Sequence, residues 1–120
     1  MFISDYIEIR ESNLHGLGVF AKKDIPARTK VEVSPGILLT KKPQNKLFKY
    51  CYSHNQKPWA VLFPLGYLGL YNSSSNPNIR VSVDCDKNLI TVTTKVNINK
   101  GEELLHDYEI FRKKAGDLTR

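Results

Sequence analysis

Asparagine and serine side chains gather at one turn of this chain, where they could face a ligand. Residues 70–78 read Leu-Tyr-Asn-Ser-Ser-Ser-Asn-Pro-Asn. Asn and Ser hydrogen-bond nearby backbone groups and Pro77 excludes a central strand, so this stretch is a polar turn. Apolar runs over 60–63 and 65–70 lead into it and a strand pattern over 79–83 leaves it. Core on both sides would hold the Asn side chains rigidly toward a ligand, whereas the plainer alternative is an ordinary surface turn.

A second candidate for chemistry is the sequence His15-Gly16-Leu17-Gly18. Its two glycines permit positive φ and allow another group to approach the backbone closely. Two interpretations stay open, a tight hairpin turn and a loop that cradles a ligand. A histidine beside such glycines, like His15, is more often an exposed turn residue than a catalytic residue or a ligand. Cys51 and Cys85 lack metal-ligand spacing, which argues against both a zinc site and a disulfide framework.

The elements that must position these residues are mostly short strands. Alternating or β-branched patterns predict strands over 6–11, 19–21, 30–33, 79–83, 89–94 and 96–98. The pattern is weakest between 34 and 58, where 49–52 suits a short strand or a helical turn, and 109–115 could form one or two helical turns. Many short strands and little helix predict a mainly β domain of several small sheets.

Length and charge set the outer limits. A chain of 120 residues is one domain, large enough to fold without cross-links. The formal net charge of +6 favours anionic partners such as nucleic acid. A mildly basic, solvated surface explains it equally well, because the lysines are scattered. The use of only two cysteines is typical of a reduced, intracellular protein. Nothing in the sequence is long and apolar enough to span a bilayer, so we also expect it to be soluble.

Three separated motifs carry a resemblance to a known family. They are Gly-Leu-Gly-Val-Phe-Ala at 16–21, Tyr-Asn-Ser-Ser-Ser-Asn-Pro-Asn at 71–78 and Gly-Glu-Glu-Leu-Leu-His-Asp-Tyr at 101–108. Their order and spacing are similar to those of SET domain methyltransferases, which move a methyl group from S-adenosylmethionine (SAM) to protein lysines. The chain looks most like the small viral and bacterial members. The resemblance implies a single SET domain over 1–120, with a catalytic core at about 6–109, a β-clip-like fold and a knot-like crossing near the C-terminus.

The resemblance also assigns roles to individual residues. Tyr108 would be catalytic, with its hydroxyl orienting the lysine amine, and Phe111 is a candidate to pack on the adenine of the cofactor. The expected cofactor is SAM, and no metal is expected. The other residues expected to bind the cofactor are Gly16, Leu17, Gly18, Asn72 and Ser73. The residues expected to line the substrate channel are Tyr71, His106, Tyr50 and Tyr52.

The chain departs from the family pattern at several positions. Ser73 replaces the usual His, and Arg28 stands where the family often has Gly. His106 replaces a Phe or Tyr that in the family controls how many methyl groups are added. A histidine can hydrogen-bond a water or the amine, which favours mono- or dimethylation. No zinc-binding cysteine cluster follows the core, so a second copy of the chain could complete the channel wall in a homodimer.

The substrate is expected to be a lysine-bearing protein, of which a histone tail is one candidate. Acidic residues near the third motif, at 102, 103, 107 and 109, could receive a basic peptide or simply be solvated. Two functions of other classes remain as alternatives. One is a catalytically silent SET-like module that binds peptide or cofactor, and the other is a small basic β domain that binds nucleic acid.

Overall fold

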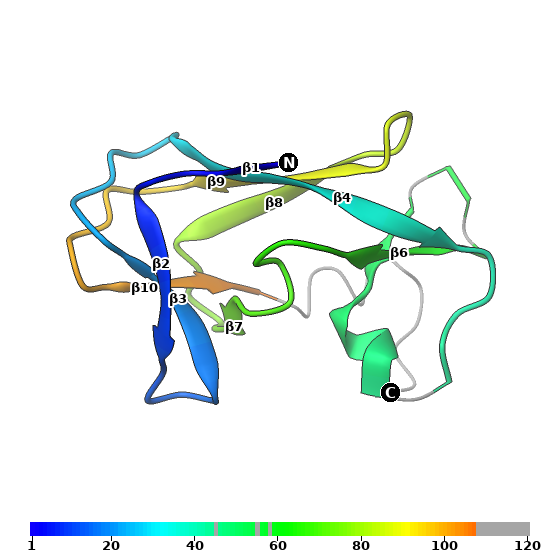
Figure 1. Cartoon of the computed structure of the whole chain (residues 1–120), viewed down its shortest axis with the longest axis horizontal. Coiled ribbons are helices and arrows are strands. Elements are labelled where there is room, and N and C mark those ends of the chain that lie inside the picture. The colour runs from blue at the N-terminus through cyan, green and yellow to red at the C-terminus, as the bar shows by residue number, and fades with distance from the viewer. Residues whose placement is uncertain (45, 55, 58, 108–120) are drawn as a thin grey trace.

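The computed structural model describes residues 1–44, 46–54, 56–57 and 59–107, which form two β-sheets with very little helix (Figure 1). This confirms the mainly β architecture predicted from the strand patterns. The described helix is a single 3-10 turn, η1 (Lys46–Tyr50), within the stretch whose sequence pattern was weakest. No helix in the described part of the chain is long and apolar enough to cross a membrane.

The larger sheet has six strands. Its order is β5-β6-β4-β9-β8, and β1 pairs with β4 beside this path. The predicted hairpin over 79–94 is present as β8 and β9, whereas the expected strand over 30–33 extends to residue 39. The six strands are β1 (Phe2–Ile3), β4 (Lys30–Leu39), β5 (Tyr52–Ser53), β6 (Val61–Pro64), β8 (Ile79–Asp84) and β9 (Leu89–Thr94).

The smaller sheet brings together the three motifs. Its order is β2-β3-β10-β7, and its strands are β2 (Ile7–Glu11), β3 (Leu17–Ala21), β7 (Asn72–Ser73) and β10 (Glu103–His106). β10 pairs antiparallel with β3, placing Leu104 opposite Val19. Further along the strand, β10 pairs parallel with β7, placing Leu105 opposite Asn72. Segments separated by more than 30 residues are therefore neighbours in one sheet.

The second motif surrounds β10 from two sides and produces the knot-like crossing. The backbone N–H of Ser74 donates to the carbonyl of His106 (2.9 Å). Four residues further on, the Asn78 side chain accepts from the N–H of Leu105 (2.7 Å) and donates to the carbonyl of Glu103 (2.9 Å). An asparagine amide offers a donor and an acceptor together, so Asn78 replaces a missing strand partner for β10.

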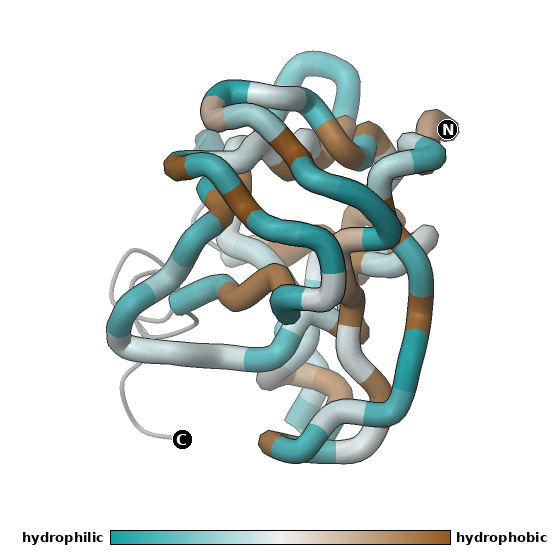
Figure 2. Tube along the Cα trace, turned by 90° about the vertical axis from the view of Figure 1, so that its left-hand side faces the viewer, coloured by the Kyte–Doolittle hydropathy of each residue, from teal (hydrophilic) through white to brown (hydrophobic). Residues whose placement is uncertain are grey.

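The core is mainly apolar and draws residues from both sheets. Figure 2 shows hydrophobic residues interspersed with hydrophilic ones along the trace, as expected where strands bury one face. The fully buried side chains include Val19, Val31, Leu62, Leu68, Tyr71, Ile90, Val92 and Leu104.

Three local features differ from, or extend, the sequence expectations. Residues 96–98 do not form a strand; Ile98 makes only an isolated bridge with Ile25. Arg28 has a φ of 61°, the left-handed region that glycine adopts most readily. The helical turns expected over 109–115 lie outside the described residues.

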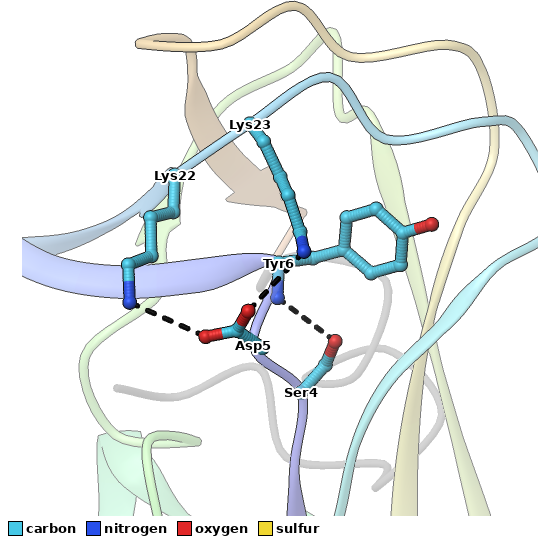
Figure 3. Close-up of polar contacts among 5 residues, drawn as sticks. All are labelled: Ser4, Asp5, Tyr6, Lys22 and Lys23. Atoms are coloured by element: carbon cyan, nitrogen blue, oxygen red, sulfur yellow. Dashed lines mark hydrogen bonds and ion pairs between the residues drawn. The ribbon is translucent and has the colours of Figure 1, made fainter.

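A surface cluster joins the start of β2 to the end of β3 (Figure 3). Asp5 accepts from the side-chain amines of Lys23 (3.2 Å) and Lys22 (3.3 Å), and Lys23 also lies 5.0 Å from the centre of the Tyr6 ring. Hydrogen bonds from Lys23 and then Lys22 lower the pKa of Asp5. Ion pairs this exposed contribute little to stability because water and salt screen them.

Candidate active site

Asn72 stands at the junction of the three motifs. Its side-chain nitrogen Nδ2 lies within hydrogen-bonding distance of the carbonyl oxygens of His15 (3.1 Å) and Leu17 (3.2 Å) in the first motif. The same nitrogen lies 2.7 Å from Oε2 of Glu103 in the third. Three acceptors fix the nitrogen side of the amide, and no described residue donates to Oδ1 of Asn72. The Asn72 oxygen is therefore left to accept a hydrogen bond from a ligand.

The two glycines of the first motif have different surroundings. Gly16 lies in an exposed turn with a φ of 48°, and a side chain there would meet no atom within 4 Å of its Cβ. Gly18 is buried in β3, and a Cβ there would collide with the Glu103 carboxylate and approach Nδ2 of Asn72 to 3.1 Å. Gly16 turns the chain, as the hairpin interpretation predicts, and Gly18 lets the third motif reach the backbone. The interpretation as a loop that cradles a ligand stays a prediction.

Ser73 follows Asn72 in β7 and is exposed. It lies opposite His106 in the parallel register of β7 and β10. Residue 73 therefore pairs with the third motif through the backbone. This pairing does not depend on whether its side chain is the serine found here or the histidine usual in the family.

The four residues predicted to line the substrate channel gather around residues 66–71. Tyr52 and His106 are in ring contact, with centroids 5.9 Å apart. The Tyr52 hydroxyl donates to the carbonyl of Leu68 (3.3 Å), and the Tyr50 ring faces Gly69, where a Cβ would lie 4.0 Å from it. Tyr71 is fully buried beside them.

His106 is 4% exposed. Burial lowers its pKa from 6.5 to about 4, against an opposing effect of Asp107. The imidazole is therefore neutral at physiological pH, and each of its ring nitrogens can either donate or accept, but not both.

A buried carboxylate that the sequence did not predict holds the chain before Asn72. Both Oε atoms of the fully buried Glu32 are engaged: Oε1 accepts from the Tyr71 hydroxyl (2.7 Å), and Oε2 accepts from the Ser34 hydroxyl (2.7 Å) and the Tyr67 N–H (2.8 Å). Burial raises the pKa of Glu32 even though these donors lower it. The pKa of Tyr71 is raised as well, first by burial and second by the neighbouring Glu32 carboxylate.

No sequence signal revealed Glu32, because alternation along 30–33 predicts Val31 and Val33 inside and Glu32 outside. The register of β4 against β9 shifts between Lys30 and Glu32, and both Val31 and Glu32 are fully buried. Such a bulge breaks the two-residue period and turns an acid inward.

Some predicted site residues remain beyond what the structure describes. Tyr108 and Phe111 lie outside the described residues, although β10 ends at His106, two residues before Tyr108. Cys51 and Cys85 form no disulfide bond with each other. No group of three or more potential metal-ligating side chains occurs within the described ranges. Of the acids near the third motif, Glu103 contacts Ser12 and Asn72, Glu102 is exposed and accepts from the N–H of Asn99 (2.6 Å), and residue 109 lies outside the described residues.

Comparison with known proteins agrees with this geometry. The sequence profile described as the SET domain matches residues 16–109. The chain belongs to the SET domain family. A histone-lysine N-methyltransferase of Schizosaccharomyces pombe, specific for lysine 37 of H3, is 31% identical over 108 residues, covering 85% of this chain and 72% of that protein.

Solved structures show the same SET fold. A candidate histone methyltransferase of Plasmodium falciparum superposes with a TM-score of 0.73 at 32% identity, over 88% of this chain and 95% of that one. The SET protein KRYPTONITE, solved with methylated DNA, an H3 peptide and S-adenosylhomocysteine (SAH), gives a TM-score of 0.70 at 21% identity. That match covers 88% of this SET domain and 24% of the other chain.

Proposed function

We propose that this SET domain transfers a methyl group from SAM to the side-chain amine of a lysine in a protein substrate. The observation that carries the proposal is the convergence of the three motifs on Asn72, whose amide nitrogen joins the first motif to the third. Membership of the SET family and the similarity to a histone-lysine methyltransferase support the same activity.

The residues at this junction fit SAM. Oδ1 of Asn72 is available to accept from an ammonium group, and the lack of a side chain at Gly18 lets Glu103 and Asn72 pack closely on its backbone. Phe111 would pack on the adenine of the cofactor. The methionine part of the cofactor would be held by Gly16, Leu17, Gly18, Asn72 and Ser73. When bound, SAM supplies an activated methyl group on a positively charged sulfur.

Alignment and exclusion of water are the main tasks of the protein. A neutral lysine amine must approach the methyl group in line, so the walls of its channel matter more than an acid or base. Tyr108 would orient the amine through its hydroxyl. Tyr50, Tyr52 and His106 would form the wall, and Tyr71 would support it from behind, because Tyr71 is fully buried and bonded to Glu32.

The substrate that we propose to test first is histone H3, because the 31% identical relative acts on an H3 lysine. The opposing consideration is charge, since a protein with a net charge of +6 attracts a strongly basic tail poorly. The homodimer that would complete the channel wall also stays a prediction, and light scattering measures it directly.

The test is a transfer assay with SAM that carries a labelled methyl group, on histones and on ribosomal proteins, read by mass spectrometry. We expect methyl-lysine, chiefly mono- and dimethylated, because His106 can hold a water or the amine by a hydrogen bond. Trimethyl-lysine as the main product would contradict the role given to His106. SAM binding without any transfer would identify a silent module instead. Salt-sensitive binding to DNA or RNA without SAM binding would identify a nucleic-acid-binding domain.

A further inference from the structure

Glu103 lies between the first two motifs although it belongs to the third. Its Oε1 accepts from the Ser12 hydroxyl (2.7 Å), just before the glycine turn, and its Oε2 accepts from Nδ2 of Asn72 (2.7 Å). Its carboxylate also occupies the space that a side chain at position 18 would need, so it packs directly on the backbone of Gly18. The carboxylate is therefore held in one place, at the site proposed for the cofactor.

Hydrogen-bond acceptors are concentrated around Nδ2 of Asn72. Two carbonyl oxygens, of His15 and Leu17, and one carboxylate oxygen, of Glu103, surround a single amide nitrogen of Asn72. An amide nitrogen has only two hydrogens, so it cannot fully satisfy three acceptors. A group of acceptors in excess of the available hydrogens favours a cationic ligand.

The charge of Glu103 has no described counter-ion. Its two side-chain partners, Ser12 and Asn72, are neutral, and the ion pairs among the described residues join Asp5 to Lys22 and Lys23. Glu103 is also only half-exposed, so water screens its charge less than that of a surface acid. This carboxylate without a counter-ion occurs in a chain whose net charge is +6.

We propose that Glu103 is the counter-charge for the cofactor and makes the site bind SAM in preference to SAH. This inference rests on the proposed function. SAM carries a carboxylate, an ammonium and a sulfonium, and hence one net positive charge. In methyl transfer the amine lone pair forms the new carbon–nitrogen bond and the carbon–sulfur electron pair stays on sulfur. The positive charge thus passes to the methylated amine, and SAH has no net charge. A fixed carboxylate stabilises the donor more than the product and thereby favours exchange of spent SAH for SAM.

The experiment is calorimetric titration of the whole chain with SAM and, separately, with SAH. Glu103→Gln removes the charge but keeps the shape: the Gln oxygen can accept from Asn72, and its NH₂ can donate to Ser12. We expect the ratio of the dissociation constants, SAH over SAM, to fall on the order of tenfold, mainly through weaker SAM binding. Glu102→Gln is the matched control, because it makes the same change in net charge one residue away at an exposed site. It should leave the ratio unchanged.

The outcomes separate this inference from the function on which it rests. If the unmodified chain bound neither ligand, the proposed function itself would be wrong. If the chain bound both ligands and Glu103→Gln left their ratio unchanged, or weakened both equally, the charge role would be overturned while the function stood. Should Glu103→Gln fail to fold by circular dichroism, the unmodified chain provides the test: salt should lower SAM affinity more than SAH affinity, and a constant ratio would overturn the inference.

Discussion

At the scale of single residues, the site depends on side chains whose charge or polarity burial controls. His106 is neutral because burial lowers its pKa to about 4. A neutral ring beside the proposed channel does not repel a cationic cofactor, whereas a protonated one would. The family motif predicted that His106 lies in the substrate channel. The protonation state of His106 follows from its burial, which only the fold reveals.

The first prediction follows from proton linkage at His106. The unfolded chain binds a proton there near pH 6.5 and the folded chain only near pH 4, so the free energy of unfolding should fall as pH drops through this window. The lowered pKa of His106 accounts for a fall of roughly 3 kcal/mol at most in the free energy of unfolding. His106→Phe should lose less stability between these pH values than the unmodified chain, as measured by urea denaturation.

The control for this prediction is His15→Phe, which removes an exposed histidine. Glu32 and Asp5 also have shifted pKa values, but they are common to all three proteins and cancel in the comparison. Parallel loss of stability in the unmodified chain and His106→Phe would show that His106 does not contribute to the acid sensitivity.

At the scale of elements, the buried Glu32 connects β4 to the segment that leads into Asn72. Its three donors come from β4 itself and from the turn between β6 and β7. Gly66 has a φ of 69° there, and a Cβ on it would collide with Glu32 and Ser34. The carboxylate and the glycine together determine how the chain enters the second motif.

Tyr71→Phe tests this connection. The substitution removes a hydrogen bond to a buried carboxylate. We therefore expect the free energy of unfolding, measured in urea at neutral pH, to fall by about 2 kcal/mol. The matched control is Tyr6→Phe, whose hydroxyl makes no hydrogen bond with a described residue and should change stability by less than about 0.5 kcal/mol. Equal stability of the two variants would mean that the Tyr71–Glu32 contact contributes nothing net.

The elements differ in how far the sequence predicted them. The hairpin over 79–94 and the β2 and β3 strands follow from alternation of apolar and polar residues, a local signal. β7 and η1 have no such signal, because β7 exists through its pairing with β10 and η1 lies among proline-punctuated loops. The bulge that buries Glu32 depends on pairing with β9, so no pattern within β4 could reveal it.

At the scale of the whole molecule, the function depends on parts of the chain that are distant in sequence. Strand periodicity predicted the β class but not that the first, second and third motifs share one sheet. The resemblance to SET domains implied a knot-like crossing near the C-terminus, not the pairing of these strands. The structure confirms the convergence through β3, β10 and β7. The roles of the individual residues in cofactor binding and catalysis stay predictions.

The most direct test of the account compares Tyr108→Phe with the unmodified chain in methyl transfer and in SAM binding. The substitution removes one hydroxyl at little change in volume, so SAM affinity and the melting temperature should be nearly unchanged. Turnover, measured as methyl-lysine by mass spectrometry, should fall roughly a hundredfold, with Tyr6→Phe as the control that keeps full activity. Full turnover by Tyr108→Phe, or absence of methyl-lysine from an unmodified chain that binds SAM, would contradict the account.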